Sequence, residues 1–270
     1  MFDEKKRIFF GFEIETLWQD IPKEKKVIEE KNRHITLLFL GENNLSDVEK
    51  YLKDLPILDE KIAPVGFFDK CLFLPEKRPR LVAYRVDFLN KKSQIEKFQN
   101  QLFEFFQNKK FEIKHNHNFF LPHVTICRNN FDINKWKDSF IKTPLYLKSF
   151  NLFESLGGSV YKTLWKKIFV QKPFLEIPHT ADIAYLIKGA NFSDLLYNSF
   201  IALSFKCLSF LNYFKELKDV KTIDDVIINL NEVITKAEIA GEHLPFKAVC
   251  FHADIIKKDD IFIWEMIVDV

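Results

Sequence analysis

The sequence contains two copies of one pattern, Arg33-His34-Ile35-Thr36-Leu37-Leu38-Phe39-Leu40-Gly41 and Phe120-Leu121-Pro122-His123-Val124-Thr125-Ile126-Cys127-Arg128. In each copy a His-x-Thr tripeptide opens an apolar run rich in β-branched residues, and such a run predicts a β-strand. Side chains alternate between the two faces of a strand, so residues two positions apart share a face. Each copy is therefore expected to present an imidazole and a hydroxyl together, opposite its central Ile35 or Val124.

A single His-x-Thr tripeptide is common by chance, and its histidine is usually a strand-end residue bonded to a backbone carbonyl. Here the two histidines lie 89 residues apart, and each tripeptide is joined to its own apolar run. The matched pair favours a functional site over that simpler interpretation. We expect two halves of one domain, each contributing one histidine and one threonine to a shared cleft.

The chemistry of such a cleft follows from its side chains. An imidazole titrates near neutral pH, with a reference pKa of about 6.5. One imidazole can take a proton from water while the other gives a proton to a leaving oxygen, and each transfer contributes roughly 10²–10⁴-fold. Threonine hydroxyls can donate hydrogen bonds to phosphoryl oxygens and stabilise developing charge. This scheme needs no metal.

The paired motifs resemble the 2H phosphoesterases, specifically the LigT-like RNA 2′,3′-cyclic phosphodiesterases. The resemblance covers about residues 5–170. Besides the motifs it includes the opening strand Arg7-Ile8-Phe9-Phe10-Gly11-Phe12, the Phe-Leu-Gly ending of the first motif, and Glu154-Ser155-Leu156 followed by Tyr161. It implies an α+β fold with two lobes around a central cleft.

The resemblance also implies the roles of the site residues. The catalytic residues would be His34 and His123, and the phosphate-binding residues would be Thr36, Thr125 and Arg128. The reaction would be cofactor-free hydrolysis of an RNA 2′,3′-cyclic phosphate to a 2′-phosphate. Because the 3′-oxygen then leaves, we provisionally assign His123 as the base and His34 as the acid. Two alternatives stay open, namely 2′–5′ RNA ligation or phosphodiester cleavage, and a non-catalytic RNA-binding adaptor.

One departure from the family pattern precedes the first histidine. Arg33 stands where the family often has proline. Proline fixes φ near −65°, so the entry to this strand is expected to be less rigid here.

The last part of the chain resembles archease over about residues 174–270. The resemblance rests on the ordered blocks His179-Thr180-Ala181-Asp182, Lys247-Ala248-Val249 with Phe251-His252, and the ending Val268-Asp269-Val270. It implies a small α+β domain that assists a GTP-dependent RNA ligase in RNA repair or tRNA processing. It further implies a metal at Asp182 and Asp269, and an activating role for Lys247. Carboxylate oxygens suit Mg²⁺ or Ca²⁺.

The archease-like part departs from its family in two respects. The stretch before Lys247 is shorter than usual, and Phe251-His252 replaces the usual Tyr-His. Both departures bear on ligase activation more than on the fold.

Gln171-Lys172-Pro173 reads as a junction, which divides the 270 residues into domains over 1–172 and 173–270. Residues 174–270 hold 9 of the 40 basic side chains of the chain and 15 of its 38 acidic side chains. The first domain is thus net basic, which suits a polyanion such as RNA, and the second is net acidic.

The composition points away from membranes. With 47% hydrophobic and 29% charged residues the chain reads as globular, and no apolar run approaches the ~20 residues that span a bilayer. The N-terminal residues lack the apolar core of a signal peptide. The four cysteines, Cys71, Cys127, Cys207 and Cys250, have no C-x-x-C spacing. We expect a cytoplasmic protein with reduced cysteines and no membrane partner.

The remaining patterns predict the other elements. Strands are expected over 7–15, 34–41, 63–74, 81–88, 119–128, 144–154, 160–170, 246–252 and 261–270, and helices over 45–55, 93–108, 191–211 and 223–237. Residues 21–31 are expected to form a helix or a loop. The phenylalanine stripe of 93–108 is interpreted as core, and His115 and His117 as loop residues.

Overall fold

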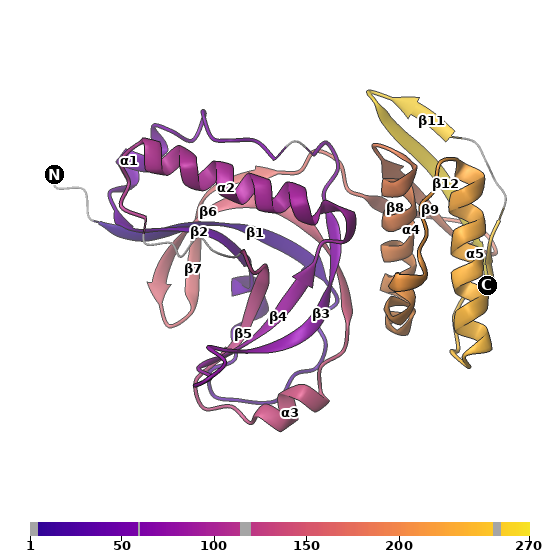
Figure 1. Cartoon of the computed structure of the whole chain (residues 1–270), viewed down its shortest axis with the longest axis horizontal. Helices are drawn as coiled ribbons and strands as arrows, with labels where there is room; N and C mark the ends of the chain where they lie inside the picture. The colour runs from indigo at the N-terminus through magenta and orange to yellow at the C-terminus, as the bar shows by residue number, and fades with distance from the viewer. Residues whose placement is uncertain (1–4, 59, 114–119, 251–254) are drawn as a thin grey trace.

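The computed structural model describes residues 5–58, 60–113, 120–250 and 255–270, and it has an α+β fold built on two antiparallel sheets (Figure 1). Residues 1–172 contain the first sheet and residues 173–270 the second. The strands of the first sheet are β1 (Lys6–Thr16), β2 (Ile35–Asn43), β3 (Val65–Leu74), β4 (Leu81–Asp87), β5 (His123–Arg128), β6 (Thr143–Gly157) and β7 (Val160–Ile168). Its helices are α1 (Leu45–Glu49), α2 (Lys92–Asn108) and α3 (Ile133–Asp138).

The first sheet closes on itself. Its strand order is β1-β2-β5-β4-β3-β6-β7, and β1 pairs with β6 as well as with β2. The closure depends on the length of β6, whose first residues pair with β3 while its later residues pair with β1. Strand β7 returns from β6 as the outer arm of a hairpin. The ring brings β2 and β5, which carry the two motifs, side by side.

Helix α2 covers the core-facing side of this sheet. Its buried side chains Ile95, Phe98, Leu102 and Phe106 recur at helical spacing, as the sequence pattern predicts. The Phe106 ring packs 5.3 Å from Phe10 of β1. The interpretation of this stripe as core is confirmed, and the opposite face of β2 is left for the polar motif residues.

The second sheet has the strand order β10-β12-β9-β8, with β11 paired to β12. Its elements are β8 (Phe174–Ile177), β9 (Ile183–Gly189), β10 (Ala248–Val249), β11 (Ile255–Lys258), β12 (Ile261–Asp269), α4 (Phe192–Lys206), α5 (Ile223–Ile239) and the 3₁₀ helix η3 (Leu208–Glu216). The helices pack on this sheet around a second core that includes Trp264 and Met266.

Several element boundaries differ from the sequence expectations. Helix α4 ends at Lys206, because Cys207 is extended (φ −142°, ψ 105°) and η3 follows. Helix α1 has only five residues, not the eleven positions of 45–55. Residues 21–31 are irregular apart from the first residues of a 3₁₀ turn, Glu30–Asn32. The short elements α3 and β8 were not expected.

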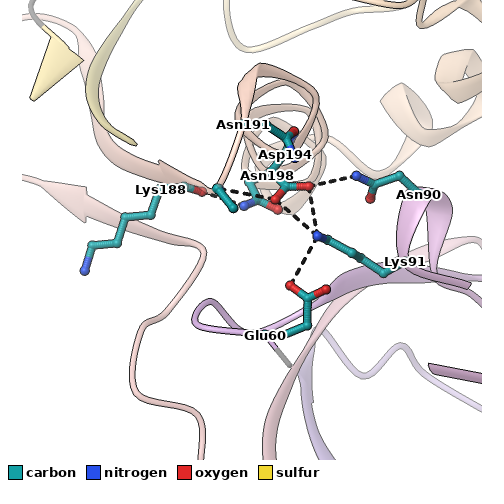
Figure 2. A network of polar contacts seen from close by, with 8 residues as sticks. Glu60, Asn90, Lys91, Lys188, Asn191, Asp194 and Asn198 are labelled. Carbon is teal, nitrogen blue, oxygen red and sulfur yellow. Dashed lines mark hydrogen bonds and ion pairs between the residues drawn. The ribbon is translucent and has the colours of Figure 1, made fainter. Parts of the chain in front are cut away.

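The two halves of the chain are in contact. Helix α4 touches β3 and β6 of the first sheet, and Val65 and Phe67 of β3 are buried in the second core. Beside these apolar contacts lies a polar network, which Figure 2 shows. The Lys91 ammonium lies 3.1 Å from both the Glu60 and the Asp194 carboxylates, so charged groups of both halves neutralise one another in a largely buried position.

Two further findings bear on membrane spanning and on the cysteines. No described helix is long and apolar enough to cross a bilayer. The four cysteines are free, and of these Cys127 is fully buried. His115 and His117, with Phe251 and His252 of the archease-like pattern, lie outside the described residues.

Candidate active site

The two His-x-Thr tripeptides lie next to each other on paired strands. Ile35 of β2 is directly opposite Val124 of β5, and both side chains are fully buried in the core. In an antiparallel pair, residues that face each other share one side of the sheet. The neighbouring cross-strand pairs are therefore His34 with Thr125 and Thr36 with His123. All four side chains project from the side opposite the core, which we call the histidine face.

A β-bulge brings Arg128 to the same face. Arg128 lies five positions after His123, and in a regular strand an odd separation would place it on the opposite side. In β5, however, Arg128, Thr125 and His123 pair with Leu81, Ala83 and Arg85, which alternate regularly along β4. The extra residue lies at Ile126, and both Ile126 and Cys127 are fully buried. Bulges often re-aim a side chain in this way beside functional sites.

Arg128 differs from the neighbouring arginine in its partners. Arg85, opposite His123, is held by Asp69, whose Oδ1 accepts from the Arg85 Nε at 2.8 Å. Within the described parts of the chain, no carboxylate lies within ion-pair distance of Arg128. Its partly buried guanidinium is thus available to an anion on the histidine face.

Both histidines are oriented by the same kind of hydrogen bond. The Nδ1 of His34 lies 2.9 Å from the carbonyl oxygen of Asn32, and the Nδ1 of His123 lies 2.8 Å from that of Leu121. A carbonyl oxygen only accepts, so Nδ1 carries the proton in each ring. In the neutral ring, Nε2 then has a free lone pair and can act as a base. The backbone bond expected of an ordinary strand-end histidine is present, and it leaves the second nitrogen for chemistry.

The pKa values of the two histidines are lowered. Burial lowers the pKa of His34 to about 4, and the positive charges of Arg128 and His123 add to this effect. Burial, followed by Arg128, also lowers the pKa of His123. In each case the carbonyl bond acts in the opposite direction. Both rings are therefore neutral at pH 7 in the free protein, and an anion on the histidine face would raise both pKa values.

Aromatic rings surround His34. Its ring centroid lies 4.8 Å from Phe9, 5.2 Å from Phe153 and 4.6 Å from Tyr161, with the Tyr161 ring edge-on. The strand register explains this packing, because Phe9 pairs with Phe153 across β1 and β6. The backbone N–H of Tyr161 also donates to the Asn32 side chain at 3.0 Å. These contacts fix the imidazole plane and account for the burial that lowers its pKa.

Arg33 anchors the start of β2 from the core side. It is 7% exposed, its Nε donates to the carbonyl of Ile28 at 2.9 Å, and its guanidinium stacks on Trp18 at 4.4 Å. The absence of proline predicted a less rigid entry to this strand. The structure shows instead that the entry is firmly held. A stacked arginine restrains this position through its side chain.

Gly11 allows β1 and β2 to approach closely beside Thr36, its cross-strand partner. A Cβ at Gly11 would lie 2.6 Å from the carbonyl oxygen of Ile35. Neither Gly11 nor Phe9 was singled out as a site residue from the sequence. With 30 phenylalanines in the chain, the strand register is what distinguishes the ring that touches His34.

The residues expected in the archease-like part lie at one end of the second sheet. Val268 pairs with Ile183 between β12 and β9, so Asp269 follows and Asp182 precedes this last pair of the register. The backbone N–H of Lys247 donates to the carbonyl of Asp269 at 2.8 Å. Asp182, Asp269 and Lys247 thus lie at the same end of the second sheet.

This pair of carboxylates is an incomplete set of metal ligands. Among residues 5–58, 60–113, 120–250 and 255–270, no cluster of three or more His, Cys, Asp or Glu side chains could hold a metal. Ca²⁺ takes six to eight oxygen ligands. Asp182 and Asp269 would fit a hard cation only with water or backbone carbonyls completing the shell.

Comparison with known proteins adds a structural likeness. The chain matches no family model and no curated protein. It is similar to the crystal structure of Escherichia coli LigT complexed with 3′-AMP, with 18% identity over 62% of this chain and 100% of that one, at a TM-score of 0.43. A structure from Thermus thermophilus shows 19% identity over 61% and 98% of the two chains, at a TM-score of 0.45. A structure described as a phosphoesterase shows 18% identity over 62% and 99%, at a TM-score of 0.41.

Proposed function

We propose that residues 1–172 form a phosphodiesterase of the 2H type that hydrolyses RNA 2′,3′-cyclic phosphates to 2′-phosphates without a metal. One observation carries the proposal: the pairing of Ile35 with Val124 sets both histidines and both threonines on one face of the sheet. The available guanidinium of Arg128 on that face suits a phosphate. The net positive charge of this part of the chain suits RNA.

The surroundings of His34 bear on which histidine is the base. His34 lies among three aromatic rings, and its pKa is lowered to about 4. Burial among these rings therefore disfavours the charged form of His34. We propose His34 as the base that takes a proton from water and His123 as the acid that protonates the leaving 3′-oxygen. This reverses the provisional assignment from the sequence.

The remaining groups would act on the phosphate. Attack of water on the cyclic phosphate forms a new P–O bond, and the bond to the 3′-oxygen breaks. Negative charge develops on the non-bridging oxygens, which the hydroxyls of Thr36 and Thr125 and the guanidinium of Arg128 can stabilise. One proton is taken from water and one proton is given to the 3′-oxygen, so the step is balanced in protons.

The first experiment measures turnover of a short RNA that ends in a 2′,3′-cyclic phosphate, with chelator present. The intact chain should produce an RNA 2′-phosphate. His34→Ala and His123→Ala should each lower turnover roughly 10²–10⁴-fold without loss of folded structure by circular dichroism. His243→Ala, outside the proposed site in the second half of the chain, is the control. Normal turnover in both active-site variants would end the assignment.

A sulfur-substituted substrate separates the two roles. Replacing the leaving 3′-oxygen by sulfur gives a leaving group that needs little protonation. His123→Ala should recover much of its activity on this substrate, whereas His34→Ala should stay inactive. The opposite pattern would restore the assignment made from the sequence.

The products of the assay with the cyclic-phosphate RNA also distinguish the alternative functions. A 2′–5′ ligase would join this RNA to a 5′-hydroxyl end, and a 2′–5′ phosphodiesterase would cleave a 2′–5′ linked oligonucleotide. A non-catalytic adaptor would bind the RNA unchanged. The two neutral imidazoles with free Nε2 atoms favour hydrolysis over simple binding.

For residues 173–270 we propose an archease-like domain that assists a GTP-dependent RNA ligase. The position of Asp182, Asp269 and Lys247 at one end of the second sheet supports it. The ligase joins the same ends that the first domain would hydrolyse, so stimulation is best measured in a His34→Ala background, where the substrate persists. The full chain should stimulate a purified ligase, and Lys247→Ala should abolish this. Equal ligation with and without the full chain would exclude the role.

A further inference from the structure

A second cavity lies beside the histidine face. It is a cavity of about 1010 Å³ where the β1–β2 hairpin meets α1 and the residues after α2. Basic residues outnumber acidic ones in its lining, and we call it the basic groove. Its basic residues are Lys5, Arg7, Lys50, Lys109 and Lys110.

The charges of the groove are only partly compensated. Three acidic residues, Glu42, Asp47 and Glu112, also line it, so five positive charges face three negative ones. The Asp47 carboxylate already forms an ion pair with the Lys50 ammonium, at 3.0 Å. For Arg7 and Lys109, no ion pair occurs within the described ranges of the chain.

One cation of the groove is oriented by aromatic rings. The Lys109 ammonium lies 5.0 Å from the centroid of Tyr51 and 5.7 Å from that of Phe105. A ring face attracts the ammonium without neutralising it. These rings therefore hold Lys109 in a restrained position, which suits an anion-binding residue.

The groove is continuous with the histidine face through Phe39. Phe39 lines the groove and is 47% exposed. It pairs with Phe9 across β2 and β1, and the two ring centroids lie 5.3 Å apart. Phe9 in turn lies 4.8 Å from His34. A chain of touching rings thus connects the candidate catalytic base to the mouth of the groove.

This combination suits single-stranded nucleic acid. Proteins that hold single strands combine a positive groove along the backbone with aromatic side chains on which bases stack. A 2′,3′-cyclic phosphate can form only at the 3′ end of an RNA. Any further nucleotides of a substrate bound at the histidines must therefore extend in the 5′ direction.

We propose that the basic groove binds the backbone phosphates of the nucleotides on the 5′ side of the terminal cyclic phosphate, with Phe39 as a stacking surface between groove and active site. This inference rests on the proposed function. It makes an RNA strand, and not a free nucleotide, the preferred substrate.

The test compares two substrates in one triple variant. The variant is Arg7→Gln, Lys109→Gln, Lys110→Gln, and the substrates are an RNA octamer ending in a 2′,3′-cyclic phosphate and a nucleoside 2′,3′-cyclic monophosphate. For the octamer, kcat/KM should fall at least tenfold, and its dependence on log salt should lose a slope of roughly 2, because about 0.7 is lost per phosphate contact. For the mononucleotide, kcat/KM should stay unchanged.

A second triple variant controls for charge alone. Lys97→Gln, Lys135→Gln, Lys137→Gln removes the same charge from positions of α2 and α3 outside the groove, and it should leave the octamer result near wild type. If the groove variant matches this control, or loses both substrates equally, the groove inference is wrong. If the wild-type chain hydrolyses neither substrate, the proposed function itself fails.

Discussion

The ammonium of Lys91 lies 3.1 Å from the carboxylate of Asp194, and this contact joins residues 103 positions apart in the chain. Asp194 also accepts from the Asn90 side chain at 2.8 Å and from the backbone N–H of Ala190 at 3.2 Å. Its side chain is only 5% exposed. This residue therefore links the segment before α2 to the first turn of α4.

Asp194→Ala should destabilise the protein strongly. The substitution leaves the buried Lys91 with Glu60 alone, and removing one partner of a buried pair costs about 3–5 kcal/mol. The control is Glu176→Ala, which removes an exposed pair with Lys206 and should cost under about 1 kcal/mol. Urea unfolding measures both. Equal losses in the two variants would show that the buried network does not hold the halves together.

Gly11→Ala should impair the site through the backbone. Its methyl group would meet the carbonyl of Ile35 at 2.6 Å, so β2 must shift beside His34. We expect a loss of stability of roughly 1–3 kcal/mol together with a clear fall in turnover. Gly66→Ala is the matched control, because its methyl would meet the carbonyl of Asp87 at 2.4 Å on strands β3 and β4. That variant should lose stability but keep turnover while folded.

The stability of the chain should depend on the titration of His34. Its pKa is lowered to about 4 in the folded protein, against 6.5 for an ordinary histidine. The unfolded chain thus binds more protons between these values. His34 stabilises the fold fully above pH 6.5 and loses up to roughly 3 kcal/mol of that contribution as the pH falls to 4.

Urea unfolding of wild type and His34→Gln at pH 7 and pH 4.5 measures this contribution. The variant should lose less stability than the wild type on acidification. His243→Gln, which lies outside the proposed site, should behave like the wild type. An unchanged difference between the two pH values in His34→Gln would mean that the imidazole is not desolvated.

Cation binding should depend on the end of the second sheet. Titration calorimetry of the full chain with Ca²⁺ should detect a site that Asp182→Asn, Asp269→Asn weakens at least tenfold, because two carboxylate ligands are lost. Asp259→Asn, Asp260→Asn removes the same charge from the turn between β11 and β12 and should leave the affinity unchanged. An affinity equal in both double variants would remove the metal assignment. Phosphodiesterase turnover should persist in chelator.

The sequence predicted best those elements that are amphipathic. Helix α2 shows a clear apolar stripe, and its observed range, Lys92–Asn108, begins one residue before the expected start. Helix α4 is buried on nearly all sides, so its residues follow no period that would reveal its end. The extension to residue 211 failed for that reason. Helix α5, by contrast, begins with a capping box of Thr222 and Asp225, which is a local pattern.

The candidate site was only partly predictable. The alternation rule places each histidine with its own threonine, and the two copies suggested a shared site. The cross-strand pairing of His34 with Thr125 depends on a contact between distant strands, which no local pattern contains. The surroundings of His34 depend on the register of β1 with β6 in the same way.

The irregularity in β5 has a consequence for comparing this chain with others. Deleting Ile126 would look like a harmless one-residue gap in an alignment. It would restore strict alternation and still leave the Arg128 guanidinium on the histidine face, because the arginine would then follow His123 by four positions. The same arrangement can therefore be reached in two ways, by a spacing of five positions with a bulge or by a spacing of four positions without one.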